Sequence, residues 1–409
     1  MISRTVGWLT LFVVGTDLFV VSPLLPRIAA ELNVGVGSAG WMVSAFALAY
    51  LAGGPRFGAL ADRIGRGRVL AVALTGFAAA NLLTGLAPDF VVLLVARACA
   101  GLAASGITPS VYALISASAP ERQRATWLAV VTSGLLLALV TGAPAGSLLA
   151  PVIGWHGVFL LLAGAAVVLL ALCAPVVRRV RPDVPDTSGA SAGPGAAVAG
   201  ATPARTAVPG PLPLRARVRA VLPTSLWALA VYGLYTYLGA GLHGTTHLPG
   251  GLVAAALAIY GAGAVTGNLC GGPLADRYGG ARVTIASLAG LAMVEAALGL
   301  AVHAGAVFLA GLGLFALAAY PYFAAHQLRL VGAFPAHAGT VLAWNNTAMY
   351  GGILVGSAVG GQILAGAGFT ALLAAAAGAG LLGALTARRA VPARPGREPV
   401  PEDAPARTA

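Results

Sequence analysis

Charged residues are scarce in this chain. They make up 9% of its 409 residues, whereas hydrophobic residues make up 58%, and the mean hydropathy is +0.88. A water-soluble domain carries about 25% charged residues, because much of its surface must face water. The composition therefore excludes an enzyme of the aqueous phase.

Reactive groups are equally sparse. The three cysteines, Cys99, Cys173 and Cys270, lie in apolar stretches without the C-x-x-C spacing of a zinc site, and the chain has no lysine. It also lacks a GxxxxGK[ST] phosphate-binding loop, which excludes direct coupling to ATP hydrolysis. Serines, histidines and acids form no cluster in any segment long enough to fold. We therefore expect no enzymatic activity, no metal and no other cofactor.

What the chain has in abundance is long apolar stretches. A helix needs about 20 apolar residues to cross the roughly 30 Å hydrocarbon core of a bilayer. The sequence predicts twelve such spans, at residues 6–28, 37–57, 69–88, 91–117, 125–149, 157–177, 220–242, 251–274, 282–303, 305–328, 338–364 and 368–387.

The spans fall into two groups of six around a segment without apolar periodicity. Residues 178–219 are rich in Pro, Gly, Ala, Ser and Thr, which is typical of a flexible linker. We therefore divide the chain into an N-terminal six-helix half (1–177), a cytoplasmic linker (178–219), a C-terminal six-helix half (220–387) and a disordered cytoplasmic tail (388–409).

The basic residues indicate how the spans are oriented. All 24 are arginines, against 12 acids. With the N-terminus inside, only Arg27 falls on the outer side and Arg97 lies within a span, so both termini are expected to be cytoplasmic in a multi-pass protein of the cell membrane. Arginines dispersed among juxtamembrane loops, without an aromatic-interleaved patch, argue against nucleic-acid binding. On the cytoplasmic side we place Arg4, Arg56, Arg63, Arg66, Arg68, Arg122, Arg124, the arginines from Arg178 to Arg219, Arg277, Arg282, Arg329 and those of the tail.

An internal repeat connects the two groups of spans. GALADRIG (58–65) follows the second span and GPLADRYG (272–279) follows the eighth, with six of eight positions identical and an offset of 214 residues. Two six-helix halves with a shared motif, joined by a cytoplasmic linker, resemble the major facilitator superfamily of transporters. This resemblance implies an all-α membrane fold of twelve helices in two pseudo-symmetric halves, which usually works as a monomer.

The repeated motif is the first candidate for gating. Gly58 is expected to let two helices approach closely, and the charges to make contacts that exist in only one of two conformations. The alternative is that this loop only enforces orientation. In the superfamily pattern a second basic residue is usual at Gly67. The gating candidates are Gly58, Asp62, Arg63, Gly65, Arg66 and Arg68, with Asp276 and Arg277 from the second copy.

Three segments resemble the proton-coupled drug and sugar efflux branch of the superfamily. They are the first span, GTDLFVVSPLLPRIAAEL, with Asp17; the fourth, LLVARACAGLAASGITPS, with Arg97; and the fifth, GLLLALVTGAPAGSLLAPVIGW, with Gly142 and Pro144. In the fifth span, Ala143 and Ser147 stand where this branch usually has glycine. The resemblance implies multidrug efflux by an antiporter, with Gly142 and Pro144 in gating.

Ionisable residues inside a bilayer are costly and therefore functional by default. Asp17 is the first candidate to carry the coupling proton, on a polar stripe facing the central cavity, because burial disfavours a charged carboxylate. The alternative is a purely structural partner of Arg97. Arg97 is expected to have room beside it for water or substrate, since Gly101 and Ala104 on its face are small.

Glu295 and His326 are secondary candidates. The resemblance implies a peripheral position for the ninth span, so Glu295 is expected to stabilise packing or to reach a loop, with a direct transport role as the alternative. His326 is a candidate to titrate near neutral pH, with a position at an interface or in a loop as the alternative.

Aromatic and amide side chains on cavity-forming spans are candidates for substrate binding. They are Tyr232 and Tyr235 in the seventh span and Asn345, Asn346 and Tyr350 in the eleventh. Helix-to-helix hydrogen bonding is the alternative role for each. The sequence predicts a secondary transporter that exports a small molecule, such as a drug, antibiotic or sugar, in exchange for protons. The alternatives are a proton symporter or facilitator for a sugar-like solute, and a non-transporting receptor or scaffold.

Overall fold

The computed structural model describes residues 4–120, 123–179, 212–246 and 250–389. Most of the predicted linker and of the predicted tail lies outside these residues. The described part is all-helical, as the composition predicts. Its first bundle consists of α1 (Arg4–Phe19), α2 (Val21–Glu31), α3 (Val36–Ala39), α4 (Trp41–Ile64), α5 (Arg66–Gly85), α6 (Phe90–Ser118), α7 (Arg124–Leu137), the π-helical turn η2 (Ala138–Gly142) and α8 (Ala143–Arg179).

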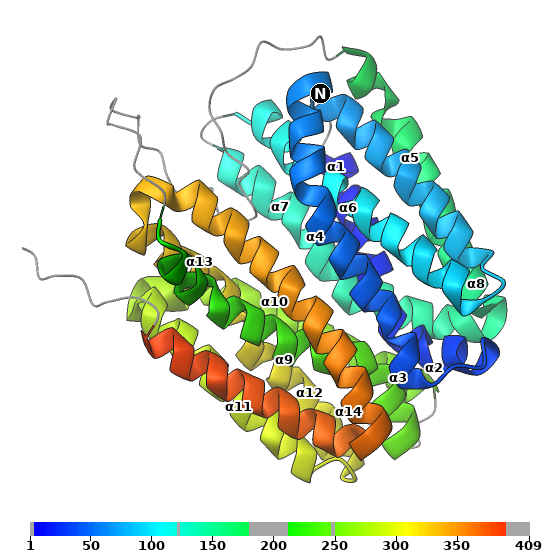
Figure 1. Cartoon of the computed structure of the whole chain (residues 1–409), viewed down its shortest axis with the longest axis vertical. Helices are drawn as coiled ribbons and strands as arrows, with labels where there is room; N and C mark the ends of the chain where they lie inside the picture. Colours follow the sequence, from blue (N-terminus) through cyan, green and yellow to red (C-terminus); the bar gives the residue numbers. More distant parts are fainter. Residues whose placement is uncertain (1–3, 121–122, 180–211, 247–249, 390–409) are drawn as a thin grey trace, which may run out of the picture.

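The second bundle begins after the linker. It consists of α9 (Leu214–Thr246), α10 (Gly250–Tyr278), α11 (Gly280–Leu300), α12 (Gly305–Ala319), α13 (Pro321–Ala333), the 3-10 turn η4 (Pro335–His337) and α14 (Ala338–Arg389). Figure 1 shows the two bundles side by side, the first in blue to green and the second in green to red.

The helices account for the predicted spans once their interruptions are counted. Among the described residues, nine helices are long and apolar enough to cross a membrane, and a tenth span is formed by α1 and α2, which meet at 45°. Two of these apolar stretches, of 49 and 52 residues, are broken by non-helical backbone at Gly154 and Gly368. Each is long enough to cross twice. The structure is therefore consistent with twelve spans.

Four glycines with positive φ mark the sharpest turns between spans. Gly65 (φ 85°) and Gly279 (φ 86°) each form a one-residue turn, between α4 and α5 and between α10 and α11. Gly154 (φ 71°) and Gly368 (φ 82°) turn the chain back within α8 and α14. Residues with a Cβ rarely adopt this backbone conformation. Both pairs are separated by the 214-residue offset of the repeated motif, so the two bundles share their backbone turns.

These turns define the two ends of the molecule. We call the end with Gly65 and Gly279 the motif end, and the end with Gly154 and Gly368 the far end. In Figure 1, α14 runs from the motif end towards the far end and returns. Among the described residues, Arg27 is the arginine at the far end and Arg97 the one in the middle of a span, while the others lie towards the motif end.

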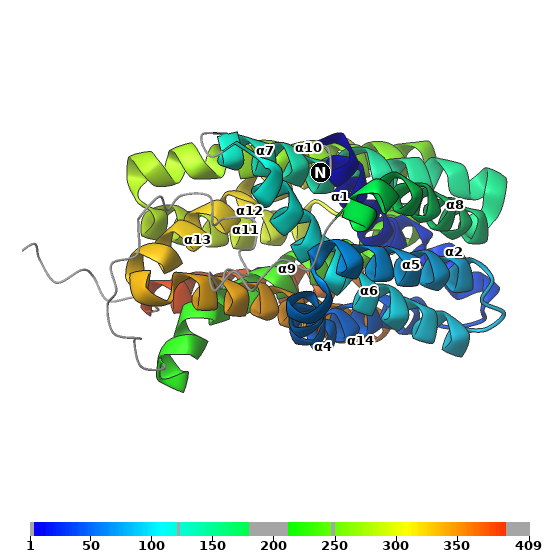
Figure 2. The same ribbon diagram turned by 90° about the horizontal axis from the view of Figure 1, so that it is seen from above.

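The two bundles meet along three sets of helices. One contact joins α4 and α3 with α14, a second joins η2 and α8 with α10 (Figure 2), and a third joins α2 with α9. Large apolar side chains such as Val91, Met293 and Leu300 are exposed on the outside. An apolar exterior of this kind is suited to contact with lipid.

Candidate functional site

The central polar feature of the first bundle is an ion pair between α1 and α6. Arg97 donates from Nη1 to Asp17 Oδ1 at 2.7 Å and from Nη2 to Oδ2 at 3.1 Å. The side chains are 1% and 0% exposed. Two parallel charge-assisted bonds are the strongest arrangement that an arginine and a carboxylate can form. The pair therefore offsets much of the cost of placing each charge in an apolar interior.

The expectation of free space beside Arg97 is wrong. Its guanidinium lies over the rings of Phe46 and Phe159, at 5.0 and 5.4 Å from their centroids. A Cβ on Gly101 would overlap the backbone of Phe46. The small residues of α6 therefore admit α4, and aromatic rings fill the volume in which we expected water or substrate.

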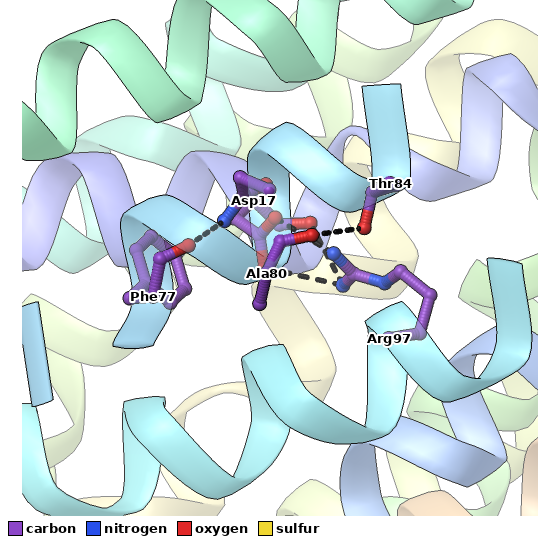
Figure 3. Close-up of polar contacts among 6 residues, drawn as sticks. Asp17, Phe77, Ala80, Thr84 and Arg97 are labelled. Atoms are coloured by element: carbon purple, nitrogen blue, oxygen red, sulfur yellow. Dashed lines mark hydrogen bonds and ion pairs between the residues drawn. The ribbon is translucent and has the colours of Figure 1, made fainter. Parts of the chain in front are cut away.

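The pair also has polar neighbours on α5. Asn81 donates to the Phe77 carbonyl at 3.1 Å, and Thr84 donates to the Ala80 carbonyl at 2.8 Å. Figure 3 shows Phe77, Ala80 and Thr84 beside the pair. The Oδ1 atom of Asn81 and the Nε atom of Arg97 are buried without hydrogen-bond partners. An acceptor and a donor thus remain free near the pair.

Asp17 does not face a central cavity, contrary to our expectation. A cavity between the bundles lies beside the end of α1 and the start of α2, where Leu18, Phe19 and Ser22 meet Tyr232 and Tyr235. It is just large enough for about one water molecule. Pairing with Arg97 inside the first bundle explains the difference, because an unpaired carboxylate would lose its solvation.

An aromatic and amide cluster joins the bundles at mid-membrane depth. The rings of Tyr50 (α4) and Tyr350 (α14) stack with centroids 3.7 Å apart and planes at 15°. Tyr350, Thr108 and Asn346 are polar side chains close to the Tyr50 hydroxyl. Of the residues predicted to bind substrate, the structure thus brings Asn346 and Tyr350 together. Sequence reasoning missed Tyr50, whose only signal was a tyrosine in an otherwise apolar span.

The other predicted tyrosines hold the bundles together. Tyr235 donates to the Phe19 carbonyl at 3.1 Å, and its own carbonyl accepts from Ser22 at 2.5 Å. Tyr232 stacks on Phe19 with centroids 6.4 Å apart. These contacts place both tyrosines at the boundary between the bundles, on the wall of the small cavity.

Further contacts close this boundary towards the far end. The hydroxyls of Ser44 and Ser357 are 2.7 Å apart, and Tyr237 donates to the Gly37 carbonyl at 3.3 Å. Gly37 and Gly361 pack so closely that a Cβ on either would overlap the other's backbone. In this conformation, the far end is where the bundles are sealed against each other.

Asn345 has a different environment from Asn346. It is buried and accepts a hydrogen bond from Thr224 of α9, and Thr224 also bonds with the Tyr322 hydroxyl at 2.8 Å. These contacts lie within the second bundle. They correspond to the alternative role of helix-to-helix hydrogen bonding.

The two secondary candidates are both fully buried. His326 Nε2 lies 3.1 Å from the Ala220 carbonyl, so the placement of His326 at an interface or loop is wrong. Glu295 lies inside the second bundle, and neither of its carboxylate oxygens has a hydrogen-bond partner. Its burial contradicts the expectation that Glu295 reaches a loop, whereas a role in packing and a direct role in transport both stay predictions.

The motif residues lie at the surface. A Cβ on Gly58 would meet no atom within 4 Å, so its expected role in close helix packing is wrong in this conformation. Gly65 instead has a backbone role, in its one-residue turn. The Asp62 side chain lies outside the part of the chain that the structure describes. The exposed motif residues are Arg63, Arg66, Arg68, Asp276 and Arg277, of which Arg277 lies over the ring of Tyr278 at 5.3 Å.

Gly142 and Pro144 flank the end of the π-helical turn. A Cβ on Gly142 would overlap Thr16, directly before Asp17 on α1. Across the boundary, a Cβ on Gly261 of α10 would overlap the backbone of Val140 in η2. The turn η2 therefore lies between the helix that carries the buried acid and the second bundle. Such π-helical turns often occur at functional sites.

Proteins built from two repeated helical bundles around a central site carry solutes across membranes by rocking the bundles against each other, so the architecture defines a secondary transporter. The chain belongs to the Major Facilitator Superfamily, whose family model matches residues 7–255 and 226–409. Members of this family are transporters and not enzymes. The resemblance inferred from the repeated motif is confirmed.

Individual relatives and structures agree with this assignment. The MFS-type transporter YceJ of Bacillus subtilis is 29% identical over 89% of this chain and 91% of its own length. The chloramphenicol resistance protein of Streptomyces lividans is 32% identical, and the alignment covers 64% of each chain. The D-xylose-proton symporter shares the fold, with a TM-score of 0.75 and 16% identity over 95% of this chain and 97% of that structure.

Proposed function

We propose that this transporter exports a small molecule in exchange for protons, and that the Asp17–Arg97 pair is the coupling site. The observation that supports this proposal is the burial of the ion pair between α1 and α6, with both side chains almost fully removed from solvent. Among the relatives, the chloramphenicol resistance protein and the multidrug resistance protein Stp of Mycobacterium tuberculosis, 32% identical over 40% of this chain and 31% of that protein, carry names that suggest efflux.

The coupling follows from the cost of an unpaired charge. Protonation of Asp17 would leave the Arg97 guanidinium without its counter-ion, at a cost of about 3 kcal/mol on membrane insertion scales. A difference of that size shifts a two-state equilibrium about 100-fold. A proton on Asp17 thus favours whichever conformation gives Arg97 another partner, and the free Asn81 oxygen is one such acceptor.

The orientation of the bundles in the membrane follows from the distribution of their arginines. Because the described arginines other than Arg27 and Arg97 lie towards the motif end, the positive-inside rule makes that end cytoplasmic, with both termini inside the cell membrane. The sealed far end then faces outwards. Transport requires the contacts of Ser44, Tyr235 and Tyr237 to open.

The substrate site is proposed at the cluster of Tyr50, Asn346 and Tyr350, with Tyr232 on the neighbouring wall. Stacked tyrosines bind flat apolar surfaces, and amide and hydroxyl groups supply hydrogen bonds. This combination suits a small amphipathic molecule. The motif residues and the Gly142–Pro144 segment are proposed to gate the change between the two states.

Two experiments test the proposal. A panel of antibiotics, dyes and sugars is screened for protection or accumulation in cells without their own exporters, with and without a protonophore. Purified protein is then assayed in proteoliposomes for uphill transport under a pH gradient. We expect the wild type and Glu31→Gln, which alters an acid at the far end, to be proton-coupled.

Asp17→Asn, and Asp17→Asn with Arg97→Gln, which removes both charges together, are expected to catalyse only downhill exchange. Uphill proton-driven transport by the folded double variant would refute the coupling site. Substrate movement in the same direction as protons would instead favour symport, and no flux with any substrate would favour a receptor or scaffold.

A further inference from the structure

The second bundle contains an acid that the coupling site does not use. Glu295 of α11 is completely buried, and both of its oxygens lack a hydrogen-bond partner. An unpaired carboxylate in an apolar interior is so costly that such a group is held in its neutral form. The neutral acid has a proton that it can give up.

The repeat relates Glu295 to a residue beside the ion pair of the first bundle. With the 214-residue offset that relates the motifs and the turn glycines, Glu295 of α11 corresponds to Asn81 of α5, the neighbour of the Asp17–Arg97 pair. The same offset relates Arg97 to Gly311 and Asp17 to Val231. The second bundle therefore lacks the ion pair and has a single acid at the equivalent depth.

Glu295 and the space between the bundles are in contact with one group of tyrosines. Tyr232, on the wall of the central cavity, packs edge-on against Trp227 with ring centroids 5.8 Å apart, and Trp227 packs edge-on against Tyr320 at 5.9 Å. The Tyr320 hydroxyl is 3.2 Å from that of Tyr260, and Tyr260 is close enough to Glu295 to interact with it electrostatically. Neighbouring hydroxyls can pass a proton by donating on one side and accepting on the other.

No other charge among the described residues faces Glu295. The elements packed against α11 are α10, α12, α13 and α14. Of these, α10 contributes Tyr260 and has its charged residues, Asp276 and Arg277, exposed at the motif end, while α12 and residues 369–387 of α14 have no ionisable side chain. His326 and Arg329 of α13 lie level with Gly280, and Arg282 is on the same end of α11, so all three are about 20 Å away along the helix.

We propose that Glu295 is a second proton-binding site, which exchanges its proton with the central cavity through Tyr260, Tyr320 and Tyr232 during each transport cycle. The inference rests on the proposed proton coupling and adds to it: two protons move per substrate, one on each bundle, and the Glu295 proton moves only in cycles that Asp17 drives. Loss of Glu295 would then halve the stoichiometry and leave Asp17 coupling intact.

The proton on Glu295 can be detected without any substitution. Glu295 is the glutamate within the predicted spans, and the other four, Glu31, Glu121, Glu398 and Glu402, lie outside them. Infrared spectra of the wild-type protein in lipid, with and without ¹³C-labelled glutamate, are recorded over a pH series. We expect a carbonyl band of a protonated acid that shifts on labelling and changes with pH or substrate. A band that never changes means a permanently neutral structural acid and overturns the proposal.

The proton-to-substrate ratio is measured from the reversal potential in proteoliposomes, which does not depend on how much protein is active. Glu295→Gln is expected to lower the ratio twofold, whereas Glu295→Asp and the lipid-facing control Met293→Leu, at a position 69% exposed on the same helix, keep it. An unchanged ratio in Glu295→Gln refutes the second site. If the wild type moves no protons, the proposed function fails, while the infrared band still decides whether Glu295 exchanges a proton.

Discussion

Removal of one partner of the Asp17–Arg97 pair should destabilise the protein more than removal of both. In Asp17→Asn, the guanidinium of Arg97 stays 1% exposed and loses its carboxylate. Breaking a buried pair costs about 3–5 kcal/mol in soluble proteins, and an arginine at the bilayer centre costs about 2.5–3.5 kcal/mol on insertion scales. Both estimates give a loss near 3 kcal/mol, which is about a 100-fold shift in the folding equilibrium.

The double variant with Asp17→Asn and Arg97→Gln contains no buried charge at this position. Amides of similar size can hydrogen-bond with each other, so we expect a stability within about 1 kcal/mol of the wild type. The Arg97→Gln variant alone should resemble Asp17→Asn, since it leaves a lone carboxylate. The four proteins form a double-mutant cycle with an interaction energy of about 5–6 kcal/mol, because two single losses near 3 kcal/mol each compare with a double-variant loss of at most about 1 kcal/mol.

The cycle is measured as unfolding free energy in lipid bicelles. Glu31→Gln serves as the matched control, because Glu31 pairs with His156 at 3.5 Å with side chains 54% and 34% exposed. An exposed pair is worth less than about 1 kcal/mol. If the double variant is as unstable as either single variant, the loss does not come from an uncompensated charge and the reasoning is wrong.

Three further predictions concern the turns, the far end and the cluster. Gly65→Ala should destabilise the protein by about 1–2 kcal/mol because of its positive φ, whereas Gly58→Ala, in open space, should not destabilise it; unfolding in bicelles compares the two. With the native cysteines replaced by alanine, Ser44→Cys with Ser357→Cys should form a disulfide that stops transport, and reductant should restore it; transport by the oxidised protein would show that the far end need not open. Tyr50→Phe should raise the substrate KM about threefold to tenfold through the loss of hydrogen bonding, and an unchanged KM in proteoliposomes would place the substrate elsewhere.

The sequence was sufficient for the spans and the repeat because both are local or periodic patterns. It was also sufficient to select Asp17 and Arg97, since any ionisable residue stands out in an apolar span. It left two roles open for Asp17, because a contact between residues 80 positions apart depends on how α1 and α6 pack.

The errors have a common physical origin. In a soluble helix, the apolar face identifies the interior, but in a membrane the lipid and the protein interior are both apolar. The sequence therefore does not tell which small residues of α6 face space and which admit another helix, as Gly101 does. For the same reason Tyr50 could not be recognised as an interior residue, and the sequence left open whether Glu295 packs inside the bundle or reaches a loop.

The one-residue turns at Gly65 and Gly279 have a mechanical consequence. A one-residue turn has no additional residues that could absorb movement. The helices α4 and α5, and likewise α10 and α11, therefore move as rigid pairs that transmit a displacement from one membrane face to the other. The flexibility that the change between conformations requires must then come from within the spans. The 45° break between α1 and α2 and the π-helical turn η2, on either side of the buried acid, are where such bending is least costly.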